Sequence, residues 1–212
     1  TTLGRRPDVS MVLVVDGLLQ GIMREIGEGW RAGRIRVAEE HIASQVIIEA
    51  LLQLRGTPGH RLPGDSPVRP TAVVGSMEGD QHHIGSLCIR VLLESAGWKV
   101  AYLGPDVPVE EFSAVQQSLS ASLVCISFSP PHTLADIHRA ARILSQFYRT
   151  EHPYALAVGG AGVIEEGEPL EMNGPFLDTG VFRSAGEFMG WIESATAGSR
   201  DGSGSMDSGV EQ

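Results

Sequence analysis

The stretch TAVVGSMEGDQHHIG, residues 71–85, decides how this chain folds. Its first seven residues form a short apolar run rich in β-branched side chains, which predicts a buried strand. A polar loop with an aspartate and two histidines follows, and residues 84–96 then show helical periodicity. Loops between a strand and the next helix lie at the carboxyl edge of an open α/β sheet, where ligands bind. We therefore expect a binding site on the loop after residue 77.

Further along the chain, β-rich runs continue to alternate with helical ones. This alternation predicts an α/β fold with a five-stranded parallel sheet that is covered by helices on both faces. The expected strands are residues 71–77, 98–104, 121–129, 154–160 and 174–180, and the expected helices are residues 84–96, 109–119, 134–148 and 185–192.

Two longer helices are expected ahead of the sheet. Apolar residues spaced by three and four from Met11 to Trp30 predict one amphipathic helix. Gly33 breaks it, and helical periodicity resumes from Ile35 to Leu54. A hairpin of two helices leaves apolar surface uncovered, so it must pack on the rest of the chain, on another copy, or on helices upstream of residue 1.

The sequence divides into four parts. We expect a helical cap at residues 1–56, formed by part of a four-helix bundle, and a linker rich in proline and glycine at residues 57–70. The α/β domain follows at residues 71–197. Residues 198–212 have almost no large apolar side chains, which predicts a disordered tail or a tether.

Composition excludes some functions. The net charge of −10 over 212 residues argues against direct DNA binding by this segment, because phosphates need a basic surface. Cys88 and Cys125 lie in apolar runs, as buried thiols do in proteins of a reducing compartment. We find no leader at the start, and the longest apolar run is too short to cross a bilayer. We expect a cytoplasmic protein with no membrane contact.

The loop after the first strand contains the element Asp80-x-His82-x-x-Gly85. A neutral imidazole ligates transition metals well, and it does so best when its other nitrogen donates to a carboxylate that orients the ring. Asp80 offers such a carboxylate, and Gly85 allows a ligand to approach the start of the helix closely. The alternative is that His82 is a solvent-exposed loop histidine and Asp80 a helix N-cap.

This element resembles the signature of the cobalamin-binding domain shared by methionine synthase, corrinoid methyltransferases, adenosylcobalamin mutases and the CarH/LitR light-sensing regulators, over residues 70–195. The resemblance implies a Rossmann-like or flavodoxin-like fold in which His82 is the lower axial ligand of cobalt and displaces the cofactor's own base. The nucleotide tail would enter a channel beside the sheet. The residues that the resemblance places around the cofactor are Asp80, Gln81, His82, His83, Ile84, Gly85, Ser127, Ser129, Gly159 and Gly160.

Two of these assignments have their own alternatives. Ser129 stands where the family has leucine, so Ser127 is the safer match to the family's Ser-x-Leu element. The pair Gly159-Gly160 would indicate only a turn if it did not follow an expected strand.

The expected hairpin carries a second resemblance, because Trp30 is followed after nine residues by Glu40-His41. This spacing resembles the Trp-x9-Glu-His motif of the CarH/LitR photoreceptors, which implies that Trp30, Glu40 and His41, with Val37 beside them, contact an upper adenosyl group. The alternative is a core tryptophan with a solvated Glu-His pair. Arg31 stands where those photoreceptors have a histidine that captures cobalt after photolysis, and a guanidinium does not ligate metals.

Together these patterns predict a module that binds adenosylcobalamin and senses light, so that photolysis rearranges the helical cap and changes oligomeric state or signalling, transcriptional or other. It would not be an enzyme, and it would form a homo-oligomer with a DNA-binding or other output domain in flanking sequence. The main alternative is a corrinoid protein that carries methyl groups for a methyltransferase, with methylcobalamin or hydroxocobalamin bound. A cobalamin storage or delivery module, or a flavodoxin-like domain for another ligand, is a third possibility.

Overall fold

The computed structural model describes residues 10–55, 69–161 and 172–201. Its five strands form one parallel sheet in the order β2-β1-β3-β4-β5. The strands are β1 (Thr71–Met77), β2 (Lys99–Val107), β3 (Leu123–Ser127), β4 (Ala155–Gly159) and β5 (Thr179–Phe182). The helices are the π-helix η2 (Leu13–Leu19), α1 (Gln20–Arg31), α2 (Val37–Leu54), α3 (Ile84–Ser95), α4 (Val109–Leu119), α5 (Leu134–Phe147) and α7 (Ala185–Asp201). The predicted fold class, an α/β sheet preceded by a helical region, is confirmed.

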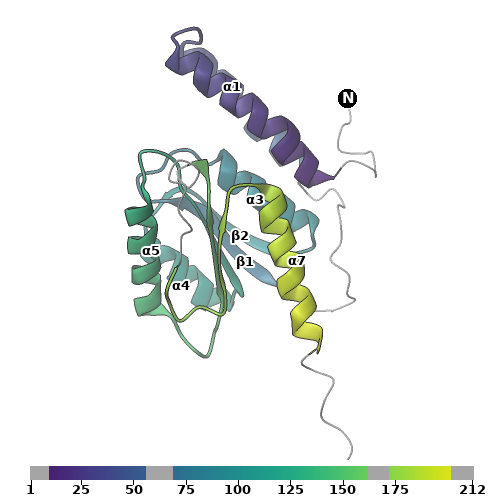
Figure 1. Cartoon of the computed structure of the whole chain (residues 1–212), viewed down its shortest axis with the longest axis vertical. Helices are drawn as coiled ribbons and strands as arrows, with labels where there is room; N and C mark the ends of the chain where they lie inside the picture. The colour runs from purple at the N-terminus through teal and green to yellow at the C-terminus, as the bar shows by residue number, and fades with distance from the viewer. Residues whose placement is uncertain (1–9, 56–68, 162–171, 202–212) are drawn as a thin grey trace, which may run out of the picture.

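The sheet has a separate apolar core on each face. Alternate strand residues face α3 and α7 on one side, where Leu51 of α2 and Leu93 of α3 are fully buried. The other strand residues face α4 and α5, with Phe112 and Leu144 at the centre. Figure 1 shows α4 and α5 on one side of the strands and α3 and α7 on the other. This burial on both faces explains why the strand sequences are nearly continuous apolar runs.

The register of the sheet brings the functional loops together. In parallel pairing, Ser76 lies opposite Ser127, and Ser127 lies opposite Gly159. The carboxyl ends of β1, β3 and β4 therefore form one edge, and the loops that follow these strands are neighbours there.

The helical hairpin packs on the α3 and α7 side of the sheet (Figure 1). Asp16 accepts hydrogen bonds from the backbone N–H groups of Ala185 and Gly186 at the start of α7, both at 2.8 Å. Arg55, at the end of α2, donates to both carboxylate oxygens of Glu94, at 2.9 and 3.1 Å. Of the packing options expected for the hairpin, docking on its own chain is therefore observed.

Part of the hairpin surface stays uncovered in this chain. Leu13, Ile42 and Val46 are 58–65% exposed. Because apolar side chains spaced by four residues lie on one face of a helix, Ile42 and Val46 form a continuous strip on α2.

Some predicted boundaries are wrong. β2 continues to Val107 instead of ending near residue 104, because two register shifts against β1 accommodate left-handed backbone at Gly104 and Asp106. β5 begins at residue 179 and not 174, since Phe176 leaves the sheet to pack on the rings of Tyr148 and Tyr154.

The last helix also differs from the expectation, since it continues past residue 192 to Asp201. The helix thereby enters the segment 198–212, for which a disordered tail was expected. Residues 202–212 lie outside the described part of the chain, and so do residues 56–68, which make up most of the expected linker.

Candidate functional site

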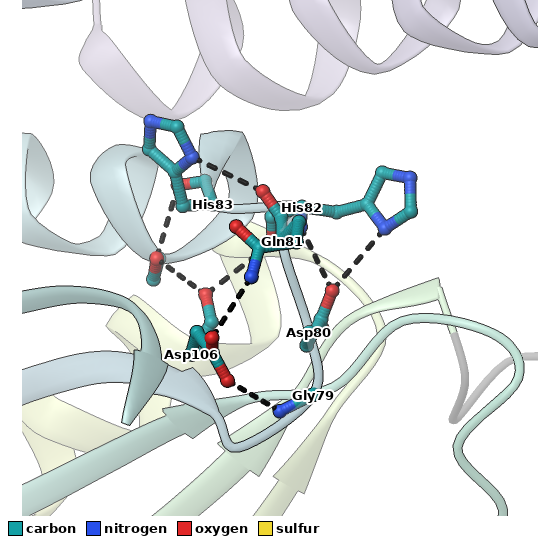
Figure 2. A network of polar contacts seen from close by, with 8 residues as sticks. Gly79, Asp80, Gln81, His82, His83 and Asp106 are labelled. Atoms are coloured by element: carbon teal, nitrogen blue, oxygen red, sulfur yellow. Dashed lines mark hydrogen bonds and ion pairs between the residues drawn. The ribbon is translucent and has the colours of Figure 1, made fainter.

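The loop between β1 and α3 holds His82 by its Nδ1 atom and leaves the rest of the ring in solvent. Asp80 is buried, and its Oδ1 atom accepts from the His82 backbone N–H at 2.9 Å and lies 3.2 Å from His82 Nδ1 (Figure 2). The His82 side chain is 76% exposed. A carboxylate at Nδ1 favours the tautomer that carries its proton there, which leaves Nε2 as a free lone pair.

Asp80 does not cap the following helix. The N-cap position of α3 is His83, and no side chain caps it. The alternative role expected for Asp80 is thus wrong, because its carboxylate is used on His82 instead. The exposure of His82 is typical of a loop histidine and also leaves Nε2 accessible to a metal.

Asp106 clamps the loop from the β2 side. Its carboxylate accepts from the Gly79 N–H at 2.8 Å and from Gln81 Nε2 at 3.0 Å, and its own N–H donates to the Asp80 carbonyl at 3.0 Å. The φ angle of Asp106 is +56°, a conformation that aspartate tolerates better than most residues. Sequence reasoning missed Asp106, although the run Leu103-Gly104-Pro105-Asp106 contained the signal of a turn.

Hydroxyl groups below the loop bind its carbonyls. Ser76 Oγ donates to the His82 carbonyl at 3.3 Å, and Ser86 Oγ donates to the His83 carbonyl at 3.0 Å. The Tyr102 hydroxyl also reaches the His83 carbonyl, at 3.4 Å, and burial raises the pKa of Tyr102. The carbonyls of residues 82 and 83 are therefore held by hydroxyl groups, and His83 Nδ1 lies 3.3 Å from the Gln81 carbonyl oxygen.

Glycines allow backbone segments to approach one another closely at the sheet edge beside this loop. A Cβ atom on Gly85 would lie 3.2 Å from Ser127 Oγ, so the glycine lets the start of α3 approach β3 closely. A Cβ atom on Gly159 would lie 2.7 Å from the Phe182 carbonyl oxygen, and one on Gly160, whose φ is +122°, would collide with the Phe128 carbonyl. The structure thus brings Gly85, Ser127, Gly159 and Gly160 to one edge, with Ser129 just beyond it.

The hairpin residues lie above this edge, but not all of them face it. Glu40 Oε2 lies 2.6 Å from His41 Nδ1, and Ser44 Oγ donates to Glu40 Oε1 at 2.7 Å. The Ser44 bond lowers the pKa of the Glu40 carboxyl against the opposite effect of partial burial, and the imidazoles of His41 and His82 lower it further. Glu40 is therefore within electrostatic reach of His82, and Figure 2 shows the hairpin passing over the loop.

Trp30 and Val37 flank the turn of the hairpin and are 51% and 57% exposed, so Trp30 is not a core residue. The neighbouring Arg31 donates to the Gly27 carbonyl of its own helix at 3.3 Å. A hollow of about 350 Å³ lies at the same turn, between α1 and Ile35, but its lining includes none of the predicted site residues.

The donor set fits a metal that brings its own macrocycle. Among residues 10–55, 69–161 and 172–201, no three His, Cys, Asp or Glu side chains gather as a bare ion would require. A single imidazole with a free Nε2, oriented by a buried carboxylate, would supply one ligand to such a metal.

Comparison with known proteins identifies this arrangement. Two models described as B12 binding domain match the chain, one over residues 70–189 and the other over residues 5–55. The repressor CarA of Myxococcus xanthus, an HTH-type transcriptional repressor, is 29% identical over 150 residues, which cover 71% of this chain and 48% of the repressor. The chain thus spans about half the length of that relative.

Corrinoid proteins also match. Dimethylamine corrinoid protein 1 of Methanosarcina mazei is 25% identical over 151 residues, covering 70% of this chain and 67% of that protein. The monomethylamine corrinoid protein of Methanosarcina barkeri has the same fold, with a TM-score of 0.63 and 16% identity over 88% of this chain and 84% of that one. These relatives are named as a repressor and as corrinoid proteins, in agreement with the expectation of a chain that binds a cofactor and is not itself a catalyst.

No helix within the described residues has the length and apolar character needed to cross a membrane. The parallel sheet, the histidine loop at its carboxyl edge and the domain match over residues 70–189 lead to one conclusion. The chain belongs to the B12 binding domain family, and cobalamin is its cofactor.

Proposed function

We propose that this chain is the adenosylcobalamin-binding module of a light-sensing regulator. His82 Nε2 would hold the cobalt, and the hairpin of α1 and α2 would cover the bound cofactor. When bound, adenosylcobalamin would supply a cobalt–carbon bond that light breaks. Loss of the adenosyl group would shift the hairpin, and this shift would change the assembly of a homo-oligomer or the activity of an output domain in flanking sequence.

The observation that carries this proposal is the placement of the α2 helix above the histidine loop. Glu40 lies within electrostatic reach of His82, on a hairpin docked to α7 by Asp16. A cap in this position covers any group bound on the cobalt face opposite His82. The similarity to the CarA repressor over 150 residues supports a regulatory role.

The residues have distinct proposed roles around the cofactor. Trp30, Val37, Glu40 and His41 form the surface for the adenosyl group, and the Glu40 carboxylate is suited to accept hydrogen bonds from ribose hydroxyls. Asp80 orients His82, while Gln81, His83 and Ile84 shape the loop below the corrin. The nucleotide tail lies along the edge made by Gly85, Ser127, Ser129, Gly159 and Gly160.

A second candidate function is that of a methyl-group carrier for a cobalamin-dependent methyltransferase. The matches to dimethylamine corrinoid proteins favour it, since the chain covers a larger share of them than of the repressor. Such a carrier must expose the upper face of its cofactor to a partner enzyme. A sensor therefore needs a hairpin that covers the cofactor, whereas a carrier needs a hairpin that can leave the cofactor exposed.

Both functions belong in a reducing compartment. Cys88 and Cys125 are free and buried. These thiols support a location in the cytoplasm, where disulfides are rare.

Illumination separates the two candidate functions. Protein loaded with adenosylcobalamin in the dark should show an irreversible change of its absorption spectrum under green light, together with a change of mass in size-exclusion chromatography with light scattering. Glu40→Gln should weaken retention of adenosylcobalamin relative to hydroxocobalamin, whereas Glu49→Gln, an exposed glutamate of the same helix, should not. Unchanged assembly after photolysis, with methyl transfer to a thiol through a partner enzyme, would establish the carrier instead.

The lower ligand has its own matched control. The electron paramagnetic resonance spectrum of bound cob(II)alamin should show hyperfine splitting from one imidazole nitrogen in the wild type and in His83→Ala. With ¹⁵N-histidine labelling to distinguish it from the cofactor's own base, the histidine splitting should be lost in His82→Ala. Retention of a protein nitrogen on cobalt in His82→Ala would overturn the assignment of this ligand.

A further inference from the structure

Tyr102 of β2 joins the histidine loop to a charged cluster on α3. Its hydroxyl donates to the His83 carbonyl at 3.4 Å and lies 3.3 Å from Ser86 Oγ. On the ring itself, the guanidinium carbon of Arg90 lies 5.0 Å from the centroid, which is a cation–π contact. One aromatic side chain therefore contacts both the backbone next to His82 and a cation of α3.

Arg90 shares the carboxylate of Glu94 with the end of the hairpin. Arg90 Nε donates to Glu94 Oε1 at 3.0 Å, and these two side chains are 16% and 17% exposed. Arg55, the C-cap residue of α2, donates to both oxygens of the same carboxylate. Burial alone would raise the pKa of Glu94, but the hydrogen bonds and charges of the two arginines lower it. An ionised Glu94 thus holds both arginines.

These contacts are continuous from the loop to the hairpin. Ser86, Arg90 and Glu94 are spaced by four residues, so they share one face of α3. The contacts start at the His83 carbonyl and run through Tyr102, Arg90 and Glu94 to Arg55. Largely buried ion pairs add little net stability over apolar side chains of similar size. Stability alone therefore gives no reason for a charged cluster at this position, whereas a mechanical link between two elements does.

We propose that Tyr102 and Arg90 are positioning residues that couple the histidine loop to the end of the hairpin, so that cobalamin binding and the docking of Arg55 on Glu94 stabilise each other. This inference rests on the proposed role of His82 as the cobalt ligand. A loop whose His82 holds a metal loses backbone freedom, and the His83 carbonyl then keeps the Tyr102 hydroxyl in place. The fixed ring keeps Arg90 against Glu94, which in turn keeps its carboxylate oriented toward Arg55.

The coupling must act in both directions. Undocking of Arg55 frees Glu94 and Arg90, and the Tyr102 ring loses the cation that packs on it. Since a coupling free energy between two sites is reciprocal, undocking weakens cobalamin binding by the same factor by which cobalamin strengthens docking.

A double-mutant cycle on cobalamin affinity tests the link. The probe is methylcobalamin in the dark, which has no adenosyl group for the hairpin to contact. Arg55→Gln should raise its Kd about 5-fold in the wild-type background, at the lower end for coupled sites. Tyr102→Phe keeps the ring under Arg90 but removes the hydroxyl from the loop. In that background Arg55→Gln should raise Kd by less than about twofold, because the link is already broken.

Hydrogen exchange reads the same coupling from the hairpin. In the wild type, saturating methylcobalamin should slow exchange of the amides in the last turn of α2 by about 5-fold, as reciprocity requires. In Tyr102→Phe the exchange of these amides should not respond to the cofactor. A tyrosine that only stabilises the sheet would leave this response intact.

Three further variants keep the test specific. Arg90→Met breaks the middle of the link, so it should reduce the effect of Arg55→Gln as Tyr102→Phe does. Tyr148→Phe removes a hydroxyl from the aromatic cluster with Tyr154 and should leave that effect at its wild-type value. Asp16→Ala loosens the hairpin at its other end, on the backbone of α7, so its effect on Kd should be the same with and without the Tyr102 hydroxyl.

The outcomes distinguish this inference from the proposal on which it rests. If His82→Ala binds methylcobalamin as tightly as the wild type, the role of His82 is wrong and the coupling loses its basis. If His82→Ala weakens binding while Arg55→Gln raises Kd equally with and without the Tyr102 hydroxyl, the coupling is overturned and the role of His82 stands.

Discussion

The contact between Asp16 and the start of α7 gives the sharpest prediction about the cap. Asp16→Ala removes the acceptor of two backbone N–H groups, those of Ala185 and Gly186. Loss of a helix-capping aspartate costs about 1 kcal/mol, and hydrogen bonds to a charged acceptor contribute roughly 1.5–3 kcal/mol each. Because one of the two bonds is exposed to solvent, we expect the free energy of unfolding to fall by about 2 kcal/mol.

Two measurements check this value. For a chain of this size, a loss of about 2 kcal/mol corresponds to a decrease of roughly 4–8 °C in Tm. Hydrogen exchange of the Ala185 and Gly186 amides should accelerate about 30-fold, since every 1.4 kcal/mol corresponds to a factor of ten. Glu49→Ala, which removes an exposed carboxylate of α2, serves as the control for charge alone.

Asp16→Ala also tests whether this side chain holds the hairpin to the α/β domain. Asp16 joins residues that are 169 and 170 positions apart in the sequence, so its loss should loosen the hairpin as well as α7. If Asp16→Ala leaves both Tm and the exchange of these amides unchanged, the hydrogen bonds of Asp16 do not hold the hairpin to the α/β domain.

Three further predictions concern the site and its supporting core. Gly160→Ala should lower the free energy of unfolding in urea by roughly 3 kcal/mol, because the new Cβ would collide with the Phe128 carbonyl and because the φ of residue 160 is +122°. The control is Gly97→Ala, where φ is also positive but the space around the Cβ is open, and its loss of stability should be less than half as large. Burial raises the pKa of the Cys88 thiol to about 12. The unfolded thiol loses its proton from about pH 8.5, so stability should fall by up to ~1.4 kcal/mol per pH unit above that pH, and Cys88→Ala should remove this part of the slope. Asp106→Ala frees the loop and should weaken cobalamin binding about 10-fold in an absorbance titration; unchanged affinity would show that the loop holds its shape without the clamp.

The sheet was predictable because its signal is local. Alternating β-rich and helical runs predicted the number of strands and the positions of the first four, and the two-residue spacing of Asp80 and His82 anticipated a contact that the structure has at 3.2 Å. Such contacts depend only on the loop's own sequence. The same local reasoning failed at β5, where Phe176 is drawn to an aromatic cluster formed by distant residues.

The residues that sequence reasoning missed reach the site from other elements. Asp106 arrives through two register shifts in β2. Register shifts and buried unpaired atoms are products of the assembled sheet, so no periodicity or spacing reports them. The docking of the hairpin through Asp16 and Arg55 could not be predicted either, because these contacts join residues far apart in the sequence. An amphipathic hairpin alone was expected.

The choice between sensor and carrier depends on how the hairpin is held. Its polar contacts to the α/β domain lie at the two ends, Asp16 near the start of α1 and Arg55 at the end of α2. The part between them carries Glu40 and faces the histidine loop, while Ile42 and Val46 point to solvent. If a bound group lies beneath the middle of this hairpin, we expect its loss to make the hairpin pivot on those ends. Exchange at the Ala185 and Gly186 amides, compared in the dark and after photolysis, therefore separates a cap that moves with light from one that only opens for a partner enzyme.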